Sequence, residues 1–236
     1  MIIEILYGEV CNLFGDSGNI SYLKASLPDA TWINTGLNDK PYFADNEVDM
    51  VYLGSGTESI QKRVVEKLLP FKDRIKTLID EGKIILITGN MTDILCKTID
   101  YGDGNKIDAL GIVDLDAKVE FKNRHNSLFL GKFMDMDIVG FNSRFSHAYG
   151  DISGKEFMKV ERGIGINRDS KLDGIRINNL YATHIIGPLL PLNPPFTKYI
   201  MGLLGAKSPE VAFEEASYEA YNQRLKEYKD PNTQLN

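Results

Sequence analysis

The chain has 236 residues, of which 43% are hydrophobic and 25% charged, and its formal net charge is −6. This composition is typical of a globular protein with a substantial core. Acidic and basic residues are mixed, which argues against nucleic acid or an anionic membrane as the main partner. Cys11 and Cys96 lack metal-ligand spacing, so we expect a reduced, cytoplasmic protein. No apolar run approaches the ~20 residues that span a bilayer, so we expect no membrane insertion.

The first hundred residues alternate between strand-like and helix-like patterns. Short apolar runs rich in β-branched residues predict strands at Ile2–Leu6, Ala30–Asn34, Asp49–Leu53 and Ile84–Ile87. Helices are predicted between them, from about Ile20 to Ser26 and from about Ser59 to Glu81. This alternation predicts an α/β fold: a mostly parallel, twisted sheet flanked by helices, with the site in loops at the carboxyl ends of the strands.

From about Lys106 the pattern changes to short strand-like segments separated by polar turns. These segments predict an antiparallel extension of the same sheet. Asn179–Ile186 indicates a further buried strand, and the chain closes with helices at Phe196–Leu204 and about 209–229. No linker rich in proline or serine interrupts the chain, so we expect a single domain over residues 1–236.

The most informative segment begins with the apolar run Ile84–Ile87. It continues through Thr88 to Gly89 and Asn90, two residue types that tolerate the backbone of a tight turn. Apolar residues then recur at helical spacing, at Met91, Ile94, Leu95 and Ile99. A strand, a bend and a helix form a nucleophile elbow, which presents the residue at its apex to a cleft. The pattern places Thr88 at that apex.

Three segments carry a family resemblance, and they occur in a fixed order. They are LYGEVCNLFGDSGNI at 6–20, VYLGSGTESIQ at 51–61 together with the elbow at 83–95, and ATHIIGPLLPLNP at 182–194. This set resembles the cobyric-acid-synthase-like class I glutamine amidotransferases, and most closely the amidotransferase subunits of bacterial lipid II isoglutaminyl synthases. The resemblance implies a flavodoxin-like fold, a role in peptidoglycan stem amidation and a Mur-ligase-like synthetase partner. No cofactor and no metal are implied.

In that family a cysteine thiolate at the elbow attacks the side-chain amide of glutamine, a histidine from a late strand is the base, and backbone N–H groups hold the oxyanion. Aligning the motifs places Thr88 at the cysteine, Gly89 and Asn90 at the two glycines that follow it, and Ile186 at the histidine. Leu128 falls at the arginine that clamps the substrate. The resemblance therefore implies an active site that has lost its catalytic groups, since isoleucine accepts no proton.

Two features keep other interpretations open. Gly54, Ser55 and Gly56 correspond to the family's glycine-rich oxyanion loop, which predicts a residual pocket for glutamine or another small molecule. His184 lies two residues before Ile186 and therefore faces the same side of an extended strand, as a possible substitute base. The sequence thus leaves three hypotheses: a catalytically defective subunit, an active glutaminase that uses Thr88 with His184, or a protein that binds a ligand in the old cleft.

Overall fold

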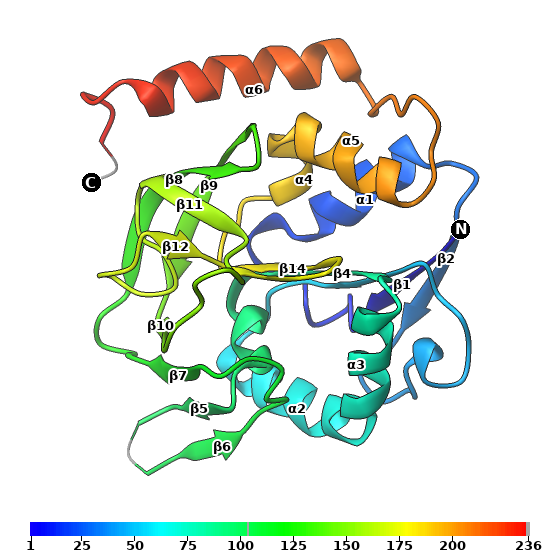
Figure 1. Ribbon diagram of the computed structural model, residues 1–236, viewed down its shortest axis with the longest axis vertical. Helices are drawn as coiled ribbons and strands as arrows, with labels where there is room; N and C mark the ends of the chain where they lie inside the picture. Colours follow the sequence, from blue (N-terminus) through cyan, green and yellow to red (C-terminus); the bar gives the residue numbers. More distant parts are fainter. Residues whose placement is uncertain (103, 235–236) are drawn as a thin grey trace.

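A six-stranded sheet forms the centre of the computed structural model, which describes residues 1–102 and 104–234 (Figure 1). The strand order is β13-β14-β4-β3-β1-β2, and only β13 runs antiparallel to its neighbour. The strands span Ile2–Leu6 (β1), Thr31–Thr35 (β2), Met50–Leu53 (β3), Ile84–Thr88 (β4), Ile175–Ile177 (β13) and Leu180–Thr183 (β14). The expected α/β class with a mostly parallel sheet is confirmed.

Helices cover both faces of this sheet (Figure 1). One face carries α2 (Glu58–Leu68) and α3 (Lys72–Asp80), and the other carries the second set: α1 (Ser17–Ser26), α4 (Leu189–Leu192) and α5 (Pro194–Leu203). The last helix, α6 (Glu214–Lys229), lies against β8 and β9. Among the helices of the described residues, none is both long and apolar enough to cross a bilayer.

The side-chain alternation of β4 decides which residues reach which half of the core. Ile85 and Ile87 pack with the apolar residues of α2 and α3, whereas Ile84 and Leu86 pack on the opposite side with those of α1 and α5. Because successive side chains of a strand point to opposite faces, the side chain of Thr88 lies on the same face of the sheet as those of Ile84 and Leu86. Its side chain is therefore directed toward the α1 side of the sheet.

The later strands form two further sheets instead of joining the central one. Their orders are β10-β7-β5-β6 and β12-β11-β8-β9. The strands span Thr98–Asp100 (β5), Lys106–Asp108 (β6), Asp116–Val119 (β7), His125–Phe133 (β8), Met136–Arg144 (β9), Ser146–Tyr149 (β10), Met158–Arg162 (β11) and Leu172–Asp173 (β12). The expected antiparallel strands are thus present, but within the central sheet only β13 is antiparallel. The β8–β9 hairpin instead buries Leu128 and Val139 under Tyr221 of α6.

The segment after β4 also differs from the prediction. It is a 3₁₀ helix, η4, at Gly89–Leu95, and Ile99 lies in β5. The carbonyl oxygens of Leu95 and Cys96 accept hydrogen bonds from the backbone of Ile112 and Gly111, respectively. These long-range bonds replace the intrahelical ones that would continue a helix.

Candidate functional site

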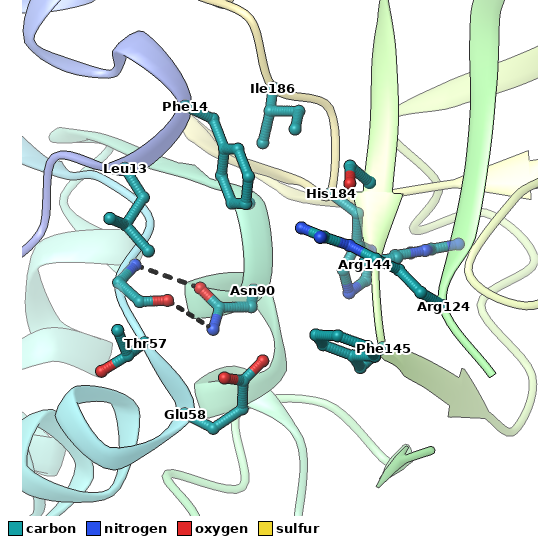
Figure 2. Close-up of a pocket in the computed structure, with 13 residues that line it drawn as sticks. Leu13, Phe14, Thr57, Glu58, Asn90, Arg124, Arg144, Phe145, His184 and Ile186 are labelled. Atoms are coloured by element: carbon teal, nitrogen blue, oxygen red, sulfur yellow. Dashed lines mark hydrogen bonds between the residues drawn. The ribbon is translucent and has the colours of Figure 1, made fainter. Parts of the chain in front are cut away.

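A cleft of about 150 Å³ opens beyond the carboxyl ends of β3, β4 and β14. Its lining includes Leu13 from the first motif, Gly56 and Gly89 from the second, and His184 and Ile186 from the third (Figure 2). The fold therefore brings together the three segments on which the family resemblance rests. His184 and Ile186 both line the cleft, and both follow the end of β14 at Thr183.

The bend after β4 does not present Thr88 to this cleft. Thr88 has ordinary extended backbone angles (φ −121°, ψ 154°), whereas Gly89 has a φ of +64°. The Thr88 side chain is fully buried, and its hydroxyl lies 3.0 Å from Asp16 Oδ1 and 3.1 Å from the Tyr52 hydroxyl. In a nucleophile elbow the strained residue at the bend carries the nucleophile. By backbone geometry the apex is Gly89, and the expectation that the Thr88 side chain enters the cleft is wrong.

Thr88 belongs to a polar cluster that joins the motifs beneath the cleft. Asp16 Oδ2 accepts hydrogen bonds from the backbone N–H and the hydroxyl of Ser55, both at 2.5 Å, and Oδ1 accepts one from Asn19 at 3.0 Å. The Asn19 carboxamide oxygen accepts from the backbone of Leu190 at 2.7 Å. Burial raises the pKa of Asp16, and the bonds from Ser55 and Thr88 oppose that shift. Asp16 and Asn19 thus hold the first loop against the other motifs.

Replacement of Thr88 by valine is expected to lower the free energy of unfolding by about 1–2 kcal/mol, because it removes two buried hydrogen bonds while it keeps the side-chain shape. Thr88→Ser retains the hydroxyl, so its free energy of unfolding is expected to be closer to that of the wild type. Urea unfolding monitored by circular dichroism measures both values. Equal stability of Thr88→Val and the wild type would contradict this structural role.

Gly89 is the residue that faces Ile186 across the cleft. A Cβ atom built on Gly89 would lie 3.4 Å from Ile186 Cγ2, and it would collide with the side chain of Ser55. Ser55 therefore fills the space that a side chain at the apex would need. The alignment placed the nucleophile and the base at Thr88 and Ile186. In the structure the two residues that face each other are Gly89 and Ile186. Neither has a side-chain group that exchanges a proton.

Two backbone donors of the Gly54–Gly56 loop are already engaged. The N–H of Ser55 bonds Asp16, and the N–H of Gly56 bonds the carboxamide oxygen of Asn90 at 3.2 Å. Asn90 Nδ2 returns a bond to the Gly56 carbonyl at 2.9 Å (Figure 2). The Gly54 position admits no Cβ atom, since one would collide with the backbone oxygen of Cys11. The loop keeps the close backbone packing of an oxyanion loop, but the side chain of Asn90 occupies the Gly56 donor.

A buried acid–imidazole pair forms part of the cleft wall. His184 Nε2 lies 2.8 Å from Asp93 Oδ1, and the side chains are 1% and 0% exposed. Burial alone would raise the pKa of Asp93, but the charge and hydrogen bond of His184, with the nearby charge of Arg144, bring it below its usual value. Sequence reasoning placed Asp93 near the start of the expected helix and missed its pairing with His184.

Leu128 lies away from the cleft. It pairs with Phe141 in the β8–β9 hairpin and packs beneath α6, so its predicted place beside the substrate is wrong. The cations that do line the cleft are Arg124 and Arg144, neither of which the alignment indicated. The Arg124 guanidinium lies over the rings of Phe14 and Phe145, 5.8 and 5.0 Å from their centroids. Arg124 directly precedes β8, and Arg144 is the last residue of β9.

Comparison with known proteins gives consistent results. Residues 2–193 match the CobB/CobQ-like glutamine amidotransferase domain. The chain is similar to the GatD subunit of lipid II isoglutaminyl synthase (glutamine-hydrolyzing) from Staphylococcus aureus strain N315, at 27% identity over 192 residues that cover 80% of this chain and 78% of the relative. The GatD subunit from Streptococcus pneumoniae strain ATCC BAA-255 / R6 is 24% identical over 201 residues, with 81% and 75% covered.

Among solved structures, PurLQS from Thermotoga maritima has a TM-score of 0.53 at 12% identity, over 95% of this chain and 98% of that chain. That likeness concerns the fold alone. The sequence match covers most of the chain and includes all three motifs that converge on the cleft. The chain therefore belongs to the family of CobB/CobQ-like glutamine amidotransferase domains.

Proposed function

We propose that this protein is a catalytically defective, cytoplasmic amidotransferase-like subunit that supports a Mur-ligase-like synthetase in the amidation of the peptidoglycan stem. The observation that carries the proposal is the chemistry at the apex of the bend. Gly89 and Ile186 face each other where catalysis in this family needs a thiol and an imidazole. Loss of a catalytic nucleophile costs on the order of a millionfold in rate.

The oxyanion side of the cleft supports the same proposal. Catalysis of acyl transfer requires free N–H donors directed at the developing oxyanion. Here the Gly56 N–H is bonded to Asn90, and the Ser55 N–H is bonded to Asp16. A glutamine carboxamide that entered the cleft would therefore have to displace an existing bond to reach either donor.

The proposed partner follows from the relatives. Both curated relatives bear the name of a subunit of a glutamine-hydrolysing synthase, and the two matches cover 80% and 81% of this chain. A subunit of this kind can act on its partner as a scaffold, or as a conduit for free ammonia, without hydrolysing glutamine itself. We propose one domain over residues 1–236 for this role.

The alternative of an active Thr88–His184 pair has little geometric support. Threonine nucleophiles require an adjacent base. The Thr88 hydroxyl is bonded to Asp16 and Tyr52, while His184 Nε2 is bonded to Asp93. The two side chains also differ in their access to the cleft: His184 lines it, whereas Thr88 is buried beneath it.

Ammonia release from glutamine tests the proposal directly. The purified protein, alone and together with the ligase-like protein that co-purifies from its native host, is expected to release no ammonia above a no-protein control. Thr88→Ala and His184→Asn are expected to leave that baseline unchanged. Glutamine turnover that either substitution abolishes would overturn the proposal. A subunit that co-purifies with no ligase-like protein would contradict the supporting role.

A further inference from the structure

A small internal cavity lies on the face of the central sheet opposite to the Thr88 side chain. Its volume is about 30 Å³. It lies between the sheet and the helices that cover this face in Figure 1, and its lining includes Val51 of β3, Leu78 of α3, and Ile85 and Ile87 of β4. None of the described residues lines both this cavity and the cleft at the bend. The two sites are therefore separate.

Only apolar groups face this cavity. Its lining consists of leucine, isoleucine and valine side chains and one phenylalanine, and each of these residues is at most 7% exposed. A cavity holds one water for about every 10–15 Å³, and each water needs polar partners. This cavity has room for about two or three waters, but its walls offer them no hydrogen bond. We therefore expect the cavity to be dry.

The chemistry and the size of the cavity limit what it can bind. An apolar atom inside it would restore the dispersion contacts that the walls of a void lack. A charged or hydrogen-bonding molecule would lose its hydration there and gain no polar partner in exchange. Benzene binds in a cavity of about 150 Å³, so this cavity is too small for an aromatic ring. The remaining class is small, apolar molecules.

We propose that this cavity binds one small, uncharged, apolar molecule of about two or three heavy atoms. Such a ligand would contact η4, because Ile94 and Leu95 at the end of that element line the cavity. Gly89 and Asn90, at the start of η4, line the cleft. The ligand site therefore adjoins the segment that forms the bend. This binding requires no nucleophile and goes beyond the proposed function.

Methyl NMR of the full chain under xenon pressure tests this site. Xenon is an apolar atom without a hydrogen-bonding group. We expect it to shift the methyl resonances of Leu78, Ile85 and Ile87, which line the cavity, and to leave those of Ile84 and Leu86 on the opposite face unchanged. Benzene is expected to cause no such shifts. Absence of the xenon shifts, shifts confined to residues outside the lining, or an equal response to benzene would each overturn the proposal.

A variant that fills the cavity places the binding there. Val51→Ile adds one buried carbon to the lining, which should raise the ratio of folded to unfolded protein about three- to fourfold and weaken xenon binding at least about tenfold. Val64→Ile is the matched control, because Val64 of α2 is fully buried but lies outside the lining. Its extra carbon overpacks the core and should lower that ratio at least about fivefold. Urea unfolding measures both ratios, and equal effects would overturn the assignment.

A variant that enlarges the cavity should accept a larger ligand. Leu78→Ala is expected to bind benzene, which should raise its melting temperature because the ligand binds only the folded state. Leu69→Ala makes the same change at a side chain that is 38% exposed, so it creates no cavity and should not respond to benzene. Equal responses, or none in Leu78→Ala, would overturn the proposal. Glutamine hydrolysis would refute the proposed function without affecting this inference, and absence of xenon binding would do the reverse.

Discussion

A glutaminase is expected from a variant that carries Gly89→Cys, Ile186→His, Ser55→Gly and Asn90→Gly, and not from one that carries Thr88→Cys and Ile186→His. The first variant should exceed the wild type at least about a hundredfold in ammonia release, a small part of the roughly millionfold effect of a catalytic nucleophile. The second should stay at the wild-type baseline. The comparison tests whether backbone geometry or sequence alignment identifies the apex.

Each substitution in the first variant has a separate reason. Gly89 has the positive φ of the bend, and its missing Cβ would lie 3.4 Å from Ile186. Ser55 must become glycine because its side chain would collide with that Cβ. Asn90 must become glycine because its carboxamide occupies the Gly56 N–H. The matched three-site variant that retains Asn90 isolates the contribution of that donor.

Thiol alkylation provides a second measurement that does not depend on turnover. Burial, followed by the charges of Glu9 and Asp16, raises the pKa of Cys11 to about 12, and burial also raises the pKa of Cys96. Thiols with raised pKa values react slowly because the thiolate is the nucleophile. Iodoacetamide at pH 6–7 should therefore label the cysteine introduced at position 89 first. Preferential labelling of the cysteine introduced by Thr88→Cys would show that the alignment is right.

The central fold was predictable because its signals are local. The strands β1, β3 and β4 are short, mostly apolar runs, and the chain alternates strands with helices. The separate sheets were not predictable in the same way. Their arrangement depends on contacts such as that between Leu128 and Tyr221 of α6, which lie far apart along the chain.

The location of the site was predictable from the sequence, but the residue predicted at the apex of the bend was wrong. The motifs do converge on one cleft, but the alignment assigned the apex to Thr88 because it matched Gly89 and Asn90 to the two glycines that follow the family's cysteine. The backbone puts the positive φ one residue later, and period-two alternation directs Thr88 into the Asp16 cluster. A shift of one residue reverses the face of a strand, so similarity at a single position could not decide the assignment.

Disruption of the buried Asp93–His184 pair is expected to have the largest effect on stability. Asp93→Ala should lower the free energy of unfolding by about 3–5 kcal/mol, since removal of one partner of a buried pair leaves the other uncompensated. Asp93→Asn should cost only about 1–2 kcal/mol, because a carboxamide can still bond His184. As a control, Asp114→Ala removes the exposed partner of Lys97 and should change stability by at most about 0.5 kcal/mol.

The pH dependence has a defined sign. The pKa of Asp93 is lowered in the folded protein, so the unfolded chain binds a proton at this carboxyl more readily than the folded chain does. The contribution of Asp93 is therefore complete above the ordinary aspartate pKa and is lost as the pH falls through the lower, folded-state value. Urea unfolding at a series of pH values below about 4 should show a steeper loss for the wild type than for Asp93→Asn. Parallel curves would mean that the carboxylate charge of Asp93 does not stabilise the fold, and the wall of the cleft would then depend on the hydrogen bond to His184 alone.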